Sequence, residues 1–143
     1  MSIKSLFALA ICVTAGVAVG ADGDLDPSFG LSGIAYLSID LGGTKVDAAA
    51  DLLVASDGKV YVVGNAATAV PAQNNAFLMR LNANDGALDL NFGKNGKFAA
   101  LEGTNGDFVA HAAAFDANGN LVVAGAKLIS GADTDFMVCR VAP

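Results

Sequence analysis

One phrase of the sequence occurs twice, as LDPSFGLSG at residues 25–33 and as LDLNFGKNG at residues 88–96. Further matches follow in the same order: DGK at 57–59 corresponds to NGN at 118–120, VVG at 62–64 to VAG at 123–125, and Arg80 to Arg140. The spacing falls from 63 to 60 residues, so the length differences lie around residues 42–44 and 71–73. Loops accept such differences more readily than strands do. The chain is therefore built from two copies of one structural unit, and this repeat outweighs local propensity in assigning the fold.

Each unit contains four strand-like runs. The dipeptides Asp57-Gly58 and Asn118-Gly119 separate the second run from the third, and such pairs supply the positive φ angles of a two-residue hairpin. The 17 Gly residues and the absence of Trp also favour a turn-rich β protein. We predict an all-β fold of two four-stranded antiparallel sheets, with strands at Ile34–Ile39, Ala48–Ala55, Val60–Val63 and Ala76–Leu81, then at Lys97–Leu101, Val109–Phe115, Leu121–Ala124 and Phe136–Val141.

One segment has a competing interpretation. DAAADLLVA at residues 47–55 is rich in good helix formers, so that in isolation it could equally be a helix. Its counterpart at residues 107–116, DFVAHAAAFD, begins with Phe and Val and leads into the equivalent Gly-containing hairpin. We therefore predict a strand in both units.

The N-terminal segment has the pattern of a secretory signal peptide. Lys4 precedes fourteen uncharged apolar or small residues at 6–19, and the small residues Ala18, Gly20 and Ala21 stand shortly before the first acidic residue. The apolar run is shorter than the roughly 20 residues that span a bilayer. We expect a helical signal peptide at residues 1–21, cleavage after Gly20 or Ala21, no stable membrane insertion afterwards, and a secreted or periplasmic product. The two-repeat β domain then covers residues 22–143, with repeat 1 at about 24–86 and repeat 2 at about 87–143.

The remaining chain is acidic and holds one cysteine. Seven basic and fourteen acidic residues disfavour binding to phosphate backbones, so nucleic acid is not an expected partner. Cys139 alone cannot form an internal disulfide and alternates with apolar residues.

The order of LDxxFGxxG, a DGK hairpin, VVGN, and an Arg four residues after an aromatic (Phe136 to Arg140) resembles the bacterial delta-60 repeat. The resemblance covers about residues 24–141. It implies one four-stranded β-propeller blade per repeat, hence a partial β-propeller here, and it implies no catalytic residues. The second unit departs from the pattern with NGN, and the first has Ala76 where an aromatic residue is expected.

Two blades do not close a ring, because propellers usually have four to eight. The sequence leaves three solutions open. Copies of the chain, or a partner protein, could cover the free sheets; the chain could be a piece of a longer array; or the two sheets could form a small sandwich. Uncovered sheet faces and edges would otherwise favour aggregation.

Several motifs suggest chemistry. Asp40, Gly42, Gly43, Thr44 and Lys45 are similar to the first phosphate loop of actin-like sugar kinases, but the chain is too short for that two-domain fold, and we interpret them as a glycine-rich turn. The weak metal candidates are Asp22, Asp24, Asp26 and His111. The three aspartates alternate as in a calcium loop, although Pro27 and Gly33 stand where that loop needs Gly and Glu.

His111, the only histidine, shares a predicted strand face with Ala113 and Phe115 and is expected in the core or near the propeller axis. Arg80 and Arg140 are expected in ion pairs at sheet edges. We assign no catalytic residue and no cofactor, with calcium as the one weak candidate. Two functions remain: an exported non-catalytic module that binds protein or glycan or assembles with itself, and a lactonase-like propeller hydrolase or lyase with a metal or acid site.

Overall fold

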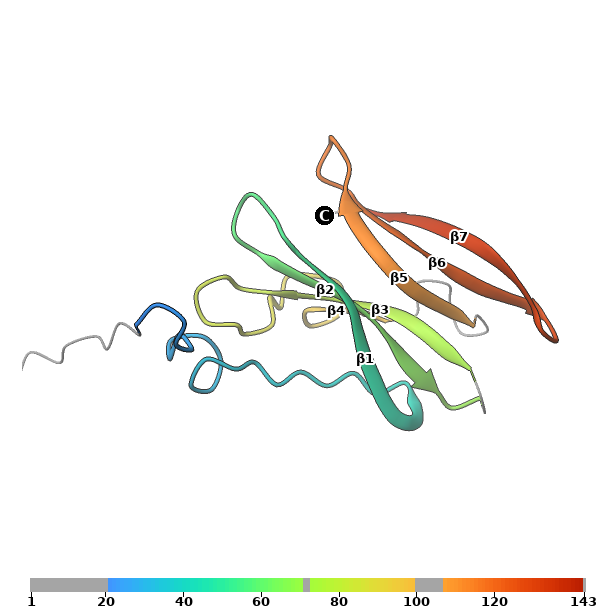
Figure 1. Cartoon of the computed structure of the whole chain (residues 1–143), viewed down its shortest axis with the longest axis horizontal. Helices are drawn as coiled ribbons and strands as arrows, with labels where there is room; N and C mark the ends of the chain where they lie inside the picture. The colour runs from blue at the N-terminus through green and yellow to red at the C-terminus, as the bar shows by residue number, and fades with distance from the viewer. Residues whose placement is uncertain (1–20, 71–72, 100–106, 143) are drawn as a thin grey trace, which may run out of the picture.

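The computed structural model describes residues 21–70, 73–99 and 107–142, and it contains two antiparallel sheets. Sheet 1 has the spatial order β1-β2-β3-β4 and sheet 2 the order β5-β6-β7 (Figure 1). The described residues contain no helix, which confirms the all-β fold. Of the expected signal peptide, only Ala21 is among them. The strands are β1 (Gly42–Val54), β2 (Val60–Thr68), β3 (Asn74–Leu81), β4 (Lys97–Ala99), β5 (Phe108–Phe115), β6 (Leu121–Ser130) and β7 (Asp133–Val141).

Both predicted hairpins form, but three residues connect the strands instead of the predicted two. The Ala55 N–H donates to the Lys59 carbonyl and the Asp116 N–H to the Asn120 carbonyl, each at 2.9 Å. Only the glycines of the two pairs, Gly58 and Gly119, have positive φ angles, 81° and 80°, as the last residue of such a loop requires. They connect β1 to β2 and β5 to β6. The segment with a competing helical interpretation, residues 47–55, forms the second half of β1, and its counterpart forms β5. Pairing within the sheet therefore overrides the helix propensity of the alanines.

Two predicted strands differ from the structure. Ile34–Ile39 is extended but belongs to neither sheet, and Lys97–Leu101, predicted as the first strand of the second unit, begins as β4 and pairs with β3 of sheet 1. Residue 101 lies outside the described residues. Within the described part of the chain, sheet 2 therefore has three strands instead of four, because the strand assigned to it completes the preceding sheet.

The two sheets pack front to back. The front face of sheet 1 carries Tyr61, Val63, Ala76, Leu78 and Arg80, and the back face of sheet 2 carries Leu121, Val123, Met137, Cys139 and Val141. Together with β5 residues such as Phe108, these faces form the main core. When the two copies of the repeat are aligned, the residues of one back face correspond to those of the other back face. This arrangement is the one expected of successive propeller blades, whereas a two-fold sandwich would join equivalent faces.

Polar side chains of sheet 1 also hold β5. The Asn65 amide donates to the Ala110 carbonyl at 3.0 Å and accepts from the Ala110 N–H at 2.7 Å. The Asp51 carboxylate accepts from the Ala113 N–H at 2.8 Å. These bonds satisfy backbone groups at the edge of β5 that does not face β6.

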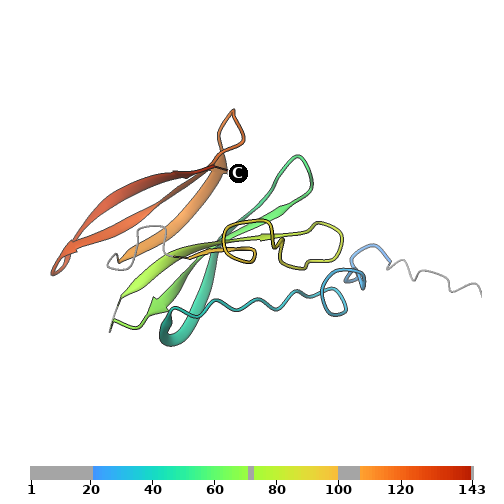
Figure 2. The ribbon, with the colours of Figure 1, turned by 180° about the vertical axis from the view of Figure 1, so that it is seen from behind.

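The chain before β1 covers the other side of sheet 1. Ile39 packs against Ala66, Phe77 and Met79 on the back face, with Leu37 and Leu41 beside it. Seen from either side, this N-terminal segment runs along the face of sheet 1 that is turned away from sheet 2 (Figures 1 and 2). The back face of sheet 1 is therefore covered in part, since Leu52 and Val54 of β1 on this face remain 59% and 62% exposed. Among the described residues, sheet 2 is covered on one face.

Candidate functional site

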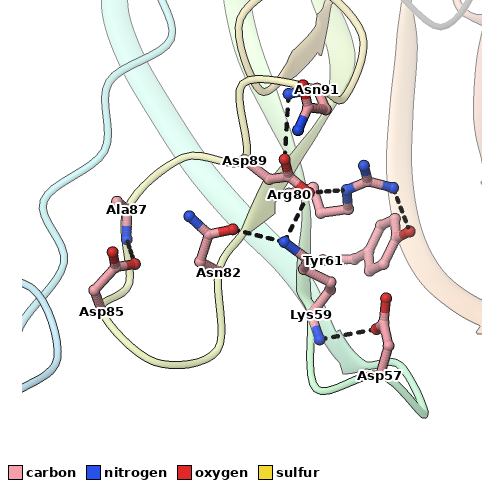
Figure 3. Close-up of polar contacts among 9 residues, drawn as sticks. All are labelled: Asp57, Lys59, Tyr61, Arg80, Asn82, Asp85, Ala87, Asp89 and Asn91. Carbon is pink, nitrogen blue, oxygen red and sulfur yellow. Dashed lines mark hydrogen bonds and ion pairs between the residues drawn. The ribbon is translucent and has the colours of Figure 1, made fainter.

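A cluster of polar and aromatic side chains joins sheet 1 to the loop that follows it. Asp89 belongs to the second copy of the repeated phrase, and its Oδ2 accepts a hydrogen bond from Arg80 Nε at 2.9 Å. The Lys59 ammonium lies 3.0 Å from the same oxygen and donates to Asn82 at 2.6 Å (Figure 3). The Arg80 guanidinium also lies over the Phe92 ring, 4.7 Å from its centroid. We call Lys59, Tyr61, Arg80, Asp89 and Phe92 the clasp.

The interactions within the clasp favour the charged forms of both Asp89 and Arg80. The hydrogen bond from Lys59 lowers the pKa of Asp89, burial opposes this effect, and the Asn91 N–H and the charge of Arg80 reinforce it. Burial acts against the charge of Arg80, but interactions with Tyr61 and Asp89 outweigh it and raise the Arg80 pKa. Asp89 is only 5% exposed, so its charge needs these partners.

The clasp positions the connection between the two units. The Asp89 N–H donates to the Arg80 carbonyl at 2.8 Å, and the Arg80 N–H donates to the Gly96 carbonyl at 3.0 Å. These bonds bring the chain back alongside β3, where it continues as β4. Phe92 meets Tyr61 edge-on at 5.7 Å and enters the core between the sheets. The clasp therefore attaches the fourth strand and fills the interface at the same time.

The lowered pKa of Asp89 predicts acid sensitivity. A carboxyl group whose pKa is lower in the folded state stabilises the fold above its unfolded pKa of about 4, and this stabilisation is lost as the pH falls through the folded pKa. We expect Asp89→Asn to unfold at lower urea concentration than the wild type at pH 6, and the difference to shrink toward pH 2. Asp133→Asn, at an exposed position, is the control and should behave as the wild type at both pH values. A pH-independent difference for Asp89→Asn would contradict the electrostatic role of the clasp.

The equivalent position in sheet 2 lacks such a cluster. Arg140 corresponds to Arg80, but its side chain is 67% exposed and its nearest acidic group is Asp116 at 3.8 Å. The carboxylate of Asp116 is held mainly by Asn120, whose hydrogen bond lowers the pKa of Asp116. The expected ion pairs of both arginines are confirmed, but only Arg80 forms its pair in a partly buried environment.

The front face of sheet 2 is exposed and apolar. Phe136 and Val138 are 90% and 59% exposed, although their repeat equivalents Ala76 and Leu78 are both fully buried against sheet 2. Monomeric proteins seldom expose contiguous large apolar side chains. The remaining members of this face come from all three strands: Val109, Ala112, Ala114, Val122, Ala124, Ala126, Leu128, Thr134 and Arg140.

The structure does not bring the predicted metal candidates together. Asp22, Asp24 and Asp26 are exposed; Asp24 accepts from the Ala21 N–H at 3.1 Å, and Asp26 accepts from the Ser28 N–H and hydroxyl at 2.9 and 2.6 Å. The described residues include no group of three His, Cys, Asp or Glu side chains placed to hold a metal ion.

His111 is exposed, so its predicted place in the core is wrong. The pairing of β5 with β6 skips one residue between Ala110 and Ala112, and His111 is the extra residue of this β-bulge. The bulge breaks the alternation on which the prediction rested. Sheet 1 has the same irregularity between Ala49 and Asp51.

The predicted glycine-rich turn at residues 40–45 is confirmed only at its start, because residues 42–45 already belong to β1. The Gly42 N–H donates to the Asp40 carboxylate at 2.8 Å, and Gly42 has a φ of 85°. Gly42 itself pairs with Thr68 of β2, and the register is irregular between Gly42 and Asp47.

Over the described ranges, no helix is long and apolar enough to cross a membrane.

Comparison with known families gives one match. Residues 55–92 match the family model described as "Domain of unknown function (DUF5122) beta-propeller". The matched segment runs from the first hairpin through β2 and β3 to Phe92, so it contains every residue of the clasp. It supports a β-propeller-type repeat, in agreement with the front-to-back sheets. No curated protein and no solved structure matched the chain.

Sequence reasoning missed most of the clasp. It assigned Arg80 to an ion pair but named neither Asp89 nor Lys59 as its partner. The signal was present, because Asp89 belongs to the repeated phrase and Lys59 to the repeated hairpin.

Proposed function

We propose that the protein is an exported, non-catalytic β-propeller module that binds a macromolecule through the front face of sheet 2, and that this macromolecule is another copy of the chain. The observation that carries the proposal is the exposure of Phe136, at a repeat position that is buried in sheet 1. An apolar face of this kind suits a second sheet better than a polar glycan.

The polar clusters support a structural role. Asp89 forms ion pairs with Arg80 and Lys59. Asp116 accepts hydrogen bonds from Asn120, and Asp51 accepts one from the backbone of β5. Each of these carboxylates has a partner that explains its presence. These carboxylates therefore stabilise the fold, and the exposed sheet surfaces are the regions that bind.

Export rests on residues 1–21 and is tested by cell fractionation. We expect the full-length gene product in a bacterial host to appear outside the cytoplasm, with Ala21 or Asp22 as its first residue by N-terminal sequencing. A matched Val13→Asp variant places a charge in the apolar run and should retain the uncleaved chain in the cytoplasm. A wild-type protein that stays in the cytoplasm with its first residues intact would contradict export.

A further inference from the structure

The two copies of the repeated phrase have the same local conformation. In the loop at residues 26–34, the Gly33 N–H donates to the Phe29 carbonyl at 2.8 Å, and Gly30 and Ser32 have φ angles of 59° and 54°. In the loop at residues 89–97, the equivalent Gly96–Phe92 bond is also 2.8 Å, with φ angles of 53° and 55° at the equivalent positions. The first loop is therefore folded before any sheet docks against it.

The two loops differ in what they contact. The second loop places Asp89 and Phe92 against sheet 1, where both are nearly buried. In the first loop the equivalent residues are Asp26, which is exposed, and Phe29, which is half-buried. Within the described residues, no preceding sheet offers the first loop an arginine equivalent to Arg80.

Sheet 2 carries the equivalent of that receiving surface. Arg140 stands at the position of Arg80, and β7 at the position of β3. The edge of β7 opposite β6 has no partner strand among the described residues. One end of the molecule thus presents the loop, and the other end presents its receptor.

We infer that the loop at residues 26–34, with the strand Ile34–Tyr36 that follows it, docks on Arg140 and the free edge of β7 in a second copy of the chain. The inference rests on the proposed function, since it names the surfaces through which the module assembles. The register follows from β4, which pairs Lys97 with Met79 and Phe98 with Leu78. The equivalent pairs are Ile34 with Cys139, Ala35 with Val138, and Tyr36 with Met137.

The docked arrangement is compatible with the positions that these residues hold in the structure. The Gly30 N–H donates to the Asp85 carbonyl at 2.8 Å, so the loop already lies at the back of its own sheet 1. Leu31 and Tyr36 are 73% and 79% exposed and remain available. Docking would therefore place the front face of sheet 2, including Phe136, toward the segment with Leu37 and Ile39 that lies over the back of sheet 1 in the other copy. This contact is head to tail, and such interfaces close into rings when the rotation permits.

The interface between copies would be less polar than the clasp. Asn120 and Val122 stand where the clasp has Lys59 and Tyr61, so Asp26 would meet one cation instead of two. Ala112 and Ala126 likewise replace Asp51 and Asn65 on the front face. Apolar contact and strand pairing would supply most of the affinity, and the Asp26–Arg140 pair would fix the orientation.

A cysteine cross-link tests the register. The Arg80 N–H bond to Gly96 makes that pair a hydrogen-bonded one, so the adjacent Met79–Lys97 pair, like its equivalent Cys139–Ile34, is of the closer, non-hydrogen-bonded type. Its expected Cα separation of about 4.5 Å lies within disulfide range. In a full chain carrying Cys12→Ala, Ile34→Cys should give oxidised dimers and higher species on a non-reducing gel. In the control Ala35→Cys, the cysteine points to the opposite face, so this variant should form no cross-link and should run as a single chain on the same gel.

Charge reversal tests the pairing between copies. Asp26→Arg and Arg140→Asp should each place like charges together and raise the dissociation constant of the assembly on the order of 100-fold. Mixing the two variants should restore assembly, because the arginine introduced in one variant then meets the aspartate introduced in the other. Asp22→Arg makes the same charge change outside the loop and should leave the mass by light scattering unchanged.

The outcomes separate the inference from the proposed function. Rescue by mixing, together with the Ile34→Cys cross-link, supports the inference. An assembled wild type that shows neither rescue nor cross-link would overturn this interface and leave self-assembly standing. A monomeric wild type would overturn both.

Discussion

Leu78→Ala should lower the free energy of unfolding by about 3–5 kcal/mol, as expected for a fully buried leucine in a well-packed core. Leu78 has no exposed surface and lies on the front face of sheet 1, between β2 and β4 and against sheet 2. Truncation would leave a cavity where the two sheets meet. Strands on every side limit how far the site can collapse. Urea denaturation followed by circular dichroism measures the loss.

Leu90→Ala is the matched control for this prediction, because it removes the same atoms from a side chain that is 68% exposed. It should change the free energy of unfolding by less than about 0.5 kcal/mol. Equal effects of the two substitutions would mean that Leu78 is not central to the packing between the sheets.

The repeat allowed much of this fold to be predicted from the sequence. Asp57-Gly58 and Asn118-Gly119 set both hairpins, and the alignment of Arg80 with Arg140 fixed the correspondence between the last strands of the two sheets. These features depend on local turn chemistry and on spacing. The comparison of two copies also resolved the alanine-rich segments correctly, where propensity alone favoured neither structure.

The assignment of strands to sheets could not be predicted in the same way. A periodic sequence shows the length of a unit but does not show where one sheet ends, so Lys97–Ala99 was placed with the strands that follow it instead of those that precede it. The position of His111 depends on a β-bulge, and an alternating pattern carries no sign of one extra residue.

The exposed face of sheet 2 became apparent only in three dimensions. The sequence showed that two blades leave surfaces uncovered, but the front-to-back packing identified which face remains open. Sheet 2 covers the front face of sheet 1. By the repeat, the front face of sheet 2 is expected to be covered by another sheet in the same way.

Phe136→Asp should have the largest effect on assembly. The side chain is 90% exposed, so the substitution should leave the fold and its melting profile intact in the separated chain. In the assembly the new carboxylate would be buried without a partner, which is strongly unfavourable. We expect the variant to be monomeric at concentrations where the wild type is assembled. Asp133→Asn, an exposed change on the same strand, serves as the control.

Self-assembly requires that another copy of the chain covers the front face of sheet 2. Multi-angle light scattering of the purified, full-length gene product after a sizing column tests it most directly. We expect a single species with a mass of two or more whole monomers, reduced to the monomer by Phe136→Asp. A wild-type protein that elutes as a monodisperse monomer across the accessible concentration range would contradict it.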